Sequence, residues 1–414
     1  MNNVCIIGLG YIGLPTAVMF ASVGYKVTGV DVKKEVLATL KGGSCHIDEP
    51  GLNQLLKEVI NSGKLSLSPK PVESDVFIIA VQTPILNPKS EIPLADLGYV
   101  KAAAMSITPV LRDGNLVVLE STSPPGITEE VLIPVLERSG LKAGDDFHVA
   151  YCPERVLPGK IMEEIVHNAR IIGGIDELSA RKAEELYRSF VEGEIYLTDA
   201  KTAEMVKLAE NTFRDVNIAL ANELSRICNE LGIDTREVIE FANKHPRVNI
   251  LKPGPGVGGH CVAVDPWFIV ERAPKESKLI KTARKINDSQ PYYVFQRVKE
   301  LVVEMGNPKI AILGMAYKGN VGDIRRSPAL EVIALLKGEG YEVSIYAPYV
   351  KGYERVEGVF DDADCIVLLT DHTLFKELNP MLISPLVRSK IIFDTRSILD
   401  KEKWESAGFK VETL

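Results

Sequence analysis

Short apolar runs alternate with longer, partly polar segments along the first half of the chain. The runs VCIIGL, YKVTGVD, DVFIIAV, NLVVLES, FHVAYC and EIYLT are rich in β-branched residues, which indicates strands. Segments such as LPTAVMFASV lie between them and have a helical pattern. This alternation is typical of βαβ units in a parallel sheet. We therefore expect one parallel-sheet domain over residues 1–197.

The pattern changes at residue 200. Residues 200–231 contain neither glycine nor proline, and Gly232 follows them directly. This composition predicts one long helix that ends at the glycine. Apolar positions lie on more than one side of the helix, so it needs several partners. We expect a central helical domain over residues 198–300 that also forms a homodimer.

Strand and helix patterns return after residue 308. The runs KIAILGMA, YEVSIYAP, DCIVLLT and KIIFDTR predict strands, and SPALEVIALLKGEG predicts a helix. This block repeats the strand, glycine turn, helix and strand of the first residues. The expected fold class is α/β, with two Rossmann-like parallel-sheet domains, 1–197 and 301–414, joined by the helical domain.

Composition excludes several classes of protein. The 414 residues are 46% apolar and 25% charged, as in globular proteins, and the net charge of −8 argues against a nucleic-acid partner. The chain has no apolar stretch of membrane-spanning length, and its start lacks a basic leader segment. The six cysteines are scattered without a CxxC pair. We expect a cytoplasmic protein with reduced thiols, no membrane contact and no metal site.

A glycine motif follows the first predicted strand. Gly8, Gly10 and Gly13 form G-x-G-x-x-G at the start of a helix, and Asp31 ends the next strand 18 residues later. Such glycines admit a pyrophosphate, and the acid accepts hydrogen bonds from ribose hydroxyls. NAD is therefore the expected cofactor, although Lys33 and Lys34 could weaken the preference over NADP. A Rossmann-like fold without a cofactor is the alternative.

The second sheet domain has basic residues in place of a full glycine set. Its turn carries Lys318, Arg325 and Arg326, Arg396 follows a later strand, and the second strand ends in Ala347-Pro348 rather than an acid. These cations suit a phosphorylated ligand other than a second dinucleotide. Solvated surface charge is the alternative.

One cysteine stands apart from the others. Cys261 follows the bare segment GPGVGGH and precedes Asp265 by four residues. Glycine lets a ligand approach the backbone, and a thiolate can add to an aldehyde. Together with NAD, this thiol suggests aldehyde oxidation through a thiohemiacetal and a thioester, with Asp265 orienting water or a lysine. Adjacent His260 has at most a minor role as a base.

The predicted long helix carries three polar residues on one face. Lys207, Asn211 and Arg214 are spaced i, i+4 and i+7. Lysine near an anionic or apolar pocket can exchange protons, and asparagine adds a donor and an acceptor. An ordinary solvated helix face is the alternative.

Seven motifs together resemble the UDP-glucose/GDP-mannose dehydrogenase family over essentially the whole chain. They are GLGYIGLP, VQTP, ESTSPPG, PERVLPG, AEMVKLAEN, GVGGHCVAVDP and GMAYKGNVGDIR, in this order. The resemblance implies oxidation of the C6 alcohol of a UDP-sugar to a carboxylate with two NAD per turnover.

The resemblance also implies roles for single residues. Cys261 is expected to be the nucleophile, Lys207 the proton donor and acceptor, and Asn211 a ligand of the reacting oxygen. Asp265, Thr122 and Glu154 are expected to assist, Thr122 by positioning water and Glu154 in thioester hydrolysis. The expected cofactor contacts are Gly8, Gly10, Tyr11, Ile12, Gly13, Asp31, Thr83, Thr122 and Arg325. The expected substrate contacts are Arg155, Val156, Lys207, Asn211, Arg214, His245, Arg247, Gly259, Tyr317, Lys318 and Arg396, with Arg247 offered across the dimer.

The chain departs from the UDP-glucose branch of this family at two positions. Pro158 stands where that branch has a second glutamate, and His260 precedes the nucleophile in place of serine. AVDPWF and HPRVNILKPGPG are similar to members that act on N-acetylated sugars. The resemblance implies UDP-N-acetyl-D-mannosamine as substrate, with UDP-N-acetylglucosamine and UDP-glucose as alternatives. A non-catalytic NAD-sensing protein is the alternative from another class.

Overall fold

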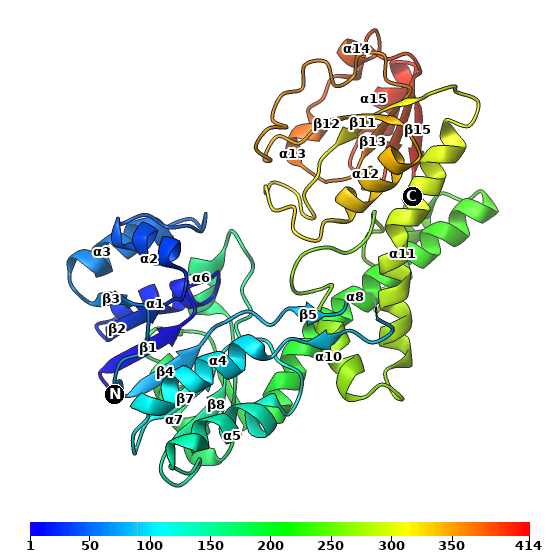
Figure 1. The fold of residues 1–414 in the computed structure, drawn as a ribbon. Helices are drawn as coiled ribbons and strands as arrows, with labels where there is room; N and C mark the ends of the chain where they lie inside the picture. The colour runs from blue at the N-terminus through cyan, green and yellow to red at the C-terminus, as the bar shows by residue number, and fades with distance from the viewer. Residues whose placement is uncertain (89) are drawn as a thin grey trace. The chain divides into compact units, whose positions relative to one another are not determined.

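The computed structural model describes residues 1–88 and 90–414. They form two compact units. The first unit comprises residues 1–210 and 267–274, and the second comprises residues 211–266 and 275–414. Figure 1 shows the elements of both units. The three-domain division of the chain stays a prediction.

An eight-stranded sheet forms the centre of the first unit. Its strand order is β10-β9-β8-β7-β4-β1-β2-β3, and every pair is parallel except β8 with β9. The strands are β1 (Asn3–Ile7), β2 (Lys26–Val30), β3 (Leu65–Ser68), β4 (Val76–Ile79), β7 (Leu116–Leu119), β8 (His148–Tyr151), β9 (Arg170–Gly174) and β10 (Ile195–Asp199). The six expected strands are confirmed. The short strands LSLS and RIIGG were missed because neither is a long apolar run.

Both faces of this sheet are buried under helices. On one face, Val4 and Ile6 of β1 belong to a core cluster with Leu14 and Phe20 of α1. Cys5, which alternates with them, lies in the cluster on the other face. Burial on both faces explains why the strands read as continuous apolar runs. The helices are α1 (Gly13–Ser22), α2 (Lys34–Lys41), α3 (Leu52–Asn61), α4 (Gly98–Ile107), α5 (Ile133–Leu136), α6 (Ile161–His167) and α7 (Glu177–Tyr187).

The first unit also contains a small ribbon and three short helical turns. Strands β5 (Ile85–Leu86) and β6 (Leu94–Ala95) pair in antiparallel fashion. The turns are η1 (Thr108–Val110), η2 (Thr128–Leu132) and η3 (Glu137–Ser139). In the main sheet, β1 lies between β2 and β4, so the strand order reverses at β1. Ligands of open parallel sheets bind at the carboxyl ends of the strands where this reversal occurs.

The second unit contains a five-stranded parallel sheet in the order β12-β11-β13-β14-β15. Its strands are β11 (Lys309–Leu313), β12 (Glu342–Tyr346), β13 (Cys365–Leu368), β14 (Ile391–Asp394) and β15 (Lys410–Thr413). Its helices are α12 (Pro328–Gly338), α13 (Thr373–Lys376), α14 (Pro380–Ile383) and α15 (Lys401–Ser406). The four expected strands are confirmed, and the polar edge strand β15 was missed.

The predicted long helix is α8 (Ala200–Leu231), with the expected bounds. The side chain of Asp199 accepts a hydrogen bond from the Thr202 N–H at 2.9 Å and so caps its start. Gly232, with φ of 69°, ends it. The other helices of this region are α9 (Thr235–Ala242), α10 (Asp265–Arg272) and α11 (Lys278–Leu301). Among the described residues, we find no helix with the length and apolar character that crossing a bilayer requires.

Candidate active site

The glycine loop after β1 has the geometry of a dinucleotide site. Gly8 has φ of 95°, and a Cβ atom there would lie 2.7 Å from the Ala80 carbonyl oxygen. A Cβ atom on Gly13 would lie 1.8 Å from the Gly8 oxygen, whereas one on Gly10 would have no neighbour within 4 Å. The fold therefore requires the first and third glycines, and the second leaves open space for a phosphate beside α1.

The carboxylate of Asp31 is fixed beside the same loop. Its Oδ2 accepts a hydrogen bond from the Leu9 N–H at 3.1 Å, and its Oδ1 accepts one from the Lys33 N–H at 2.8 Å. Each carboxylate oxygen has a second lone pair, so Asp31 can still accept ribose hydroxyls. The residues of this loop therefore fit a dinucleotide.

The other expected cofactor contacts of the first unit lie at the same edge of the sheet. Thr83 follows β4 and donates a hydrogen bond from Oγ1 to the Thr122 carbonyl after β7, at 2.6 Å. Ser121 Oγ donates to the Val81 carbonyl at 2.7 Å and joins the same two loops. Tyr11 and Ile12 belong to the glycine loop itself. The expected contact Arg325 lies in the second unit.

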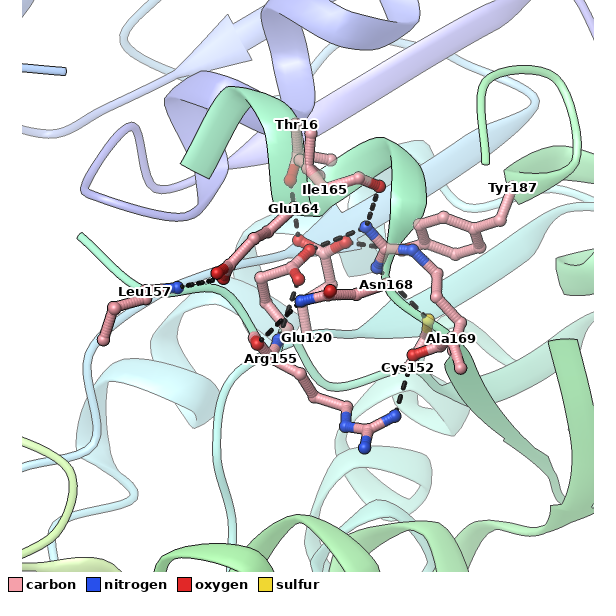
Figure 2. Close-up of polar contacts among 12 residues, drawn as sticks. Thr16, Glu120, Cys152, Arg155, Leu157, Glu164, Ile165, Asn168, Ala169 and Tyr187 are labelled. Atoms are coloured by element: carbon pink, nitrogen blue, oxygen red, sulfur yellow. Dashed lines mark hydrogen bonds and ion pairs between the residues drawn. The ribbon is translucent and has the colours of Figure 1, made fainter. Parts of the chain in front are cut away.

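A buried polar cluster that includes Glu120, Cys152 and Tyr187 lies behind this edge (Figure 2). Arg170 forms a 2.7 Å ion pair with Glu154, and both side chains are at most 4% exposed. Glu120 accepts hydrogen bonds from the Tyr187 hydroxyl at 2.6 Å and from Thr16 Oγ1 at 3.3 Å. Burial opposes the charge of Arg170, but Glu154 beside it and Glu120 nearby raise the pKa of Arg170 and keep it charged.

Burial changes the protonation of this cluster. It raises the pKa of Glu120 to about 7, against the opposing attraction of Arg170. Burial likewise raises the pKa of the Cys152 thiol to about 12, so this cysteine stays protonated.

Carboxylates also hold the segment that follows Glu154. Glu154 itself accepts from the Arg155 N–H at 2.8 Å, and Glu164 accepts from the Leu157 N–H at 2.7 Å. Glu49, which is 5% exposed, accepts from the N–H groups of residues 159 and 161 at 2.8 and 2.7 Å. Every second N–H of residues 155–161 is thereby bound to a carboxylate. This rigid segment carries the expected substrate contacts Arg155 and Val156.

Arg155 is fixed on both sides. It forms an ion pair with Glu210 of α8 at 2.5 Å, and its Nη1 donates to the Ala169 carbonyl at 2.8 Å. Val156 packs against the core of the first unit. Lys207, one turn before Glu210, is partly buried. The structure therefore joins the 155–161 segment to the start of the polar face of α8.

The segment that carries Cys261 lies against the sheet domain of the second unit. A Cβ atom on Gly258 would lie 2.6 Å from both Tyr317 Cβ and the Arg326 carbonyl oxygen, and one on Gly254 would lie 2.6 Å from Arg396 Nη1. We expected these glycines to make room for a ligand. Instead, these glycines leave space for other parts of the protein, because the segment lies directly against residues 317–328 and 396. Gly259, with φ of 87°, contacts the Tyr317 ring.

The end of this segment is held by α8. Asn211 Nδ2 donates a hydrogen bond to Asp265 Oδ2 at 2.6 Å, and Asp265 is buried while Cys261 is exposed. The Cys261 carbonyl accepts the N–H groups of Val264 and Asp265 at 2.9 and 2.8 Å, which starts α10. The structure therefore unites Cys261, Asp265 and Asn211. Burial, together with the Arg325 guanidinium, lowers the pKa of His260 and favours its neutral form.

The basic residues of the second unit divide into two groups. Arg396 donates from Nη2 to the Tyr317 carbonyl at 3.4 Å, and Lys318 follows Tyr317 in the same turn. Arg325 instead forms a 2.6 Å ion pair with Asp323. His245 and Arg247 are exposed in the segment after α9, and Arg214 is exposed on α8. Tyr317, Lys318 and Arg396 thus lie beside the thiol segment.

Sequence reasoning missed several residues that hold these segments, namely Glu49, Glu120, Arg170, Glu204 and Asn222. Each is buried and polar, but a single sequence does not reveal burial. A glutamate directly after an apolar run, such as Glu120 after LVVL, was the available signal.

The three parts of the chain match known protein domains. Residues 2–191 match the NAD binding domain of the UDP-glucose/GDP-mannose dehydrogenase family, 201–289 its central domain, and 311–401 its UDP binding domain. The chain belongs to this family. The protein is therefore an oxidoreductase, an NAD-dependent dehydrogenase of nucleotide sugars that uses NAD and takes a UDP-sugar.

Individual relatives agree with this assignment. The UDP-N-acetyl-D-mannosamine dehydrogenase of Methanocaldococcus jannaschii is 50% identical, with 100% of this chain and 96% of that protein covered. The NDP-N-acetyl-D-galactosaminuronic acid dehydrogenase of Ralstonia nicotianae is 45% identical over 96% of both. The solved UDP-D-ManNAc dehydrogenase of Pyrococcus horikoshii is 45% identical with a TM-score of 0.93, covering 99% of this chain and 98% of that one.

Two glycine substitutions separate folding from cofactor binding. We expect Gly13→Ala to lower the free energy of unfolding by more than about 2 kcal/mol, because its Cβ atom would overlap the Gly8 carbonyl. Gly10→Ala should fold with near wild-type stability but bind NAD at least about tenfold more weakly, because it fills the open space. Urea denaturation and NAD titration measure the two effects. Equal NAD affinity in Gly10→Ala would contradict this placement of the pyrophosphate.

The buried carboxyl of Glu120 predicts a pH-dependent stability. Its pKa is about 7 in the folded protein but about 4.3 in an unfolded chain, so the folded state holds an extra proton between these values. The free energy of unfolding should therefore fall as pH rises through this window, by up to about 3 kcal/mol. Glu120→Gln stays neutral and removes this contribution.

Urea denaturation of wild type and Glu120→Gln at pH 5, 6, 7 and 8 tests the prediction. The stability of wild type relative to Glu120→Gln should decline as pH rises. The exposed residue Glu163 provides the control, since Glu163→Gln should run parallel to wild type. Parallel curves for Glu120→Gln as well would show that Glu120 does not hold the proton.

Proposed function

We propose that the protein oxidises the C6 alcohol of UDP-N-acetyl-D-mannosamine to UDP-N-acetyl-D-mannosaminuronate, with two NAD reduced per turnover. The observation that carries this proposal is the exposed thiol of Cys261, in one segment with Asp265, which accepts a hydrogen bond from Asn211 of α8. We place the reaction in the cytoplasm, in line with cysteines that are all thiols.

Relatives support the choice of sugar. Proteins 49% and 50% identical over the whole chain are named UDP-N-acetyl-D-mannosamine dehydrogenases. A relative named for N-acetyl-D-galactosaminuronic acid is nearly as similar, at 45%. The second candidate is therefore the same oxidation of another N-acetylated UDP-sugar, such as UDP-N-acetylglucosamine. UDP-glucose is the more distant alternative.

The first oxidation converts the alcohol to an aldehyde. Bound NAD supplies the hydride acceptor for this and the later oxidation. Lys207 is the acceptor of the hydroxyl proton as the C6 hydride departs, and the Asn211 amide holds the C6 oxygen. Tyr317, Lys318 and Arg396 would hold the UDP group, because two of them are cationic and all three lie beside the thiol segment.

The second oxidation proceeds on sulfur. The Cys261 thiolate forms a C–S bond to the aldehyde carbon, and the resulting alkoxide faces Lys207 and Asn211. Loss of the second hydride turns this thiohemiacetal into a thioester. Water then adds to the carbonyl, the C–S bond breaks, and the thiolate leaves. One alcohol, one water and two NAD give one carboxylate, two NADH and three protons.

Two carboxylates are candidates for assisting hydrolysis. Asp265 is bonded to Asn211 in the segment that carries the thiol, so it is well placed to orient water. Glu154 is engaged with buried Arg170. We therefore assign Glu154 chiefly to holding the 155–161 segment and Asp265 to the water, with Thr122 as a further water or cofactor contact.

We also propose that the protein is a homodimer through α8. Phe213, Leu220, Ile227 and Leu231 are exposed, by 67%, 44%, 46% and 65%, and recur at spacings of seven, seven and four on one helical face. This apolar face lies opposite the polar face of Asn211 and Asn222. A second copy of α8 is the occupant that fits, because the same face is offered by both chains. Arg247 of the partner subunit would complete the substrate site.

A non-catalytic NAD sensor is the competing class. It would need the glycine loop and Asp31 but not Cys261, Lys207 or Asn211. The partly buried hydrogen bond from Asn211 to Asp265 favours an enzyme.

We expect two NADH per UDP-N-acetyl-D-mannosamine consumed, without free aldehyde, because the second oxidation follows on the tethered intermediate. Absorbance of NADH and chromatography of the sugar measure the ratio across a panel of UDP-sugars. Cys261→Ala should bind NAD normally but form no acid.

The possible results distinguish the candidate functions. One NADH per sugar would eliminate the four-electron reaction, and no NADH from any UDP-sugar would favour the sensor. Normal acid formation by Cys261→Ala would show that an aldehyde hydrate is oxidised directly. Faster turnover of another N-acetylated UDP-sugar would support the second candidate.

The dimer proposal is tested on the exposed apolar face. Leu220→Glu with Ile227→Glu should give a monomer, because four like charges would face one another across the interface. Light scattering after size exclusion measures the mass. Leu382→Glu replaces a leucine on α14 that is more exposed, at 70%, and should leave the dimer intact. A dimer that survives the double substitution would place the interface elsewhere.

A further inference from the structure

Helix α8 holds both ends of the segment that carries the thiol. Asn211 Nδ2 donates to Asp265 Oδ2 at 2.6 Å, and Asn222 Oδ1 accepts the Gly254 N–H at 2.9 Å. The two asparagines are eleven residues apart, which is about 16 Å along a helix. The segment between Gly254 and Asp265 also has eleven steps and could extend to roughly 36 Å or more. The two ends of the segment are therefore held much closer together than its extended length would allow. The two hydrogen bonds to α8 set the position of Cys261.

A buried chain of polar groups supports the Asn222 end. Arg284 of α11 forms an ion pair with Asp215 of α8, and both side chains are at most 1% exposed. Asn287 Nδ2 donates to Asp215 Oδ1 at 2.8 Å, and Asn222 Nδ2 donates to Asn287 Oδ1 at 2.9 Å. The Asn222, Asn287 and Asp215 side chains are fully or almost fully buried. The chain ends at the N–H of Gly254.

The ion pair fixes the direction of every bond in this chain. The carboxylate of Asp215 can only accept, so Asn287 must turn its amide nitrogen toward it and its oxygen toward Asn222. Asn222 must then donate to that oxygen, which leaves its own oxygen for Gly254. The orientation of a side-chain amide is otherwise ambiguous. Here the Asp215 carboxylate, paired with Arg284, and the Asp215 backbone carbonyl, which accepts from the same Asn287 nitrogen at 2.9 Å, decide it. The result is an acceptor aimed at the thiol segment.

We infer that Asn222 is a positioning residue for Cys261, acting through the Gly254 N–H, and that the Arg284–Asp215–Asn287 chain sets its orientation. The inference rests on the proposed function, in which Cys261 is the nucleophile. Asn211 bonds to Asp265, beyond the thiol, and contacts the reacting oxygen in our mechanism. Asn222 bonds to Gly254 at the other end of the segment and contacts neither the thiol nor the reacting oxygen. Its effect should therefore appear in the chemical steps, not in cofactor binding.

Two substitutions at this position test the inference. Asn222→Leu keeps the volume but removes both bonds, and should lower kcat by about tenfold or more while the KM for NAD stays within about twofold. Asn222→Asp should behave in the same way at high pH, where its carboxylate repels the Asn287 oxygen. When protonated, the acid has an O–H for Asn287 and a carbonyl for Gly254, as asparagine does.

Activity of Asn222→Asp relative to wild type should therefore recover as pH falls. A buried carboxyl has a raised pKa, so the recovery should come between about pH 9 and about pH 6. The charged groups around this position are Asp215 and Arg226 on α8, Arg284 and Asp288 on α11, and Arg396 against Gly254. All are present in wild type as well, so dividing by the wild-type rate at each pH removes their effects.

Asn229 provides the matched control, since it lies two turns further along the same face of α8 and is exposed. Asn229→Leu and Asn229→Asp should keep wild-type kcat at every pH. The inference is overturned if Asn222→Leu retains its kcat, or if Asn222→Asp tracks Asn222→Leu at all pH values. A space-filling role for Asn222 gives that second result.

Hydrogen exchange separates this inference from the proposed function. In Asn222→Leu, the amides of residues 254–265 should exchange at least about tenfold faster than in wild type, because Gly254 loses its acceptor. They should be unchanged in Asn229→Leu. If wild type forms no NADH from any UDP-sugar, the proposed function fails, and this exchange still decides whether Asn222 holds the thiol segment. Unchanged exchange in Asn222→Leu would overturn the inference.

Discussion

Buried carboxylates that accept backbone N–H groups hold the segments on which the site of this protein depends. A parallel sheet satisfies the N–H groups of its strands, but not those of the segments that leave its carboxyl edge. Glu204 of α8 accepts from the backbone of Gly126 and Thr128 after β7. In the second unit, Asp394 accepts from the N–H groups of residues 396, 398 and 399 after β14. Such segments become fixed surfaces rather than loose connections.

This arrangement has an energetic consequence. Burial raises the pKa values of Glu204 and Asp394, because a charge is costly in a poorly solvated interior, and the hydrogen bonds from N–H groups oppose that effect. Each carboxylate therefore stays in place only while its segment keeps its native shape. Segment and acid stabilise one another, and for this reason several of these acids lie next to residues that we assign to the cofactor or the substrate.

Helix α8 extends the same principle to the thiol. One of its faces is apolar and exposed, and the opposite face carries Asn211, Asp215 and Asn222, which bind the segment from Gly254 to Asp265 directly or through α11. Cys261 itself is exposed and has little side-chain cover. A thiol that is to act as the proposed nucleophile needs its backbone fixed from both ends. The helix supplies this fixation, and the glycines of the segment let it lie under Tyr317 and Arg396.

Much of the fold could be read from the pattern of residues. Continuous β-branched runs indicated ten strands, because burial on both faces removes polar positions from a parallel strand. Strands β3, β9 and β15 were not predicted, because they are short and rich in serine, glycine or charged residues. The glycine loop was also predictable, since its chemistry is local: a tight turn, an open approach and a close helix contact require glycine at fixed spacing.

The order of residues was enough to predict ten strands, the long helix α8, the NAD loop with Asp31, and the exposure of Cys261. These features arise from neighbours in the chain. Other contacts became visible only in the folded chain. Glu154 pairs with Arg170, and Asn222 accepts a hydrogen bond from Gly254. The glycines before Cys261 lie against Tyr317 and Arg396. Those contacts join residues from 16 to 142 positions apart. Burial turns a polar side chain into a structural group, and burial depends on the whole fold.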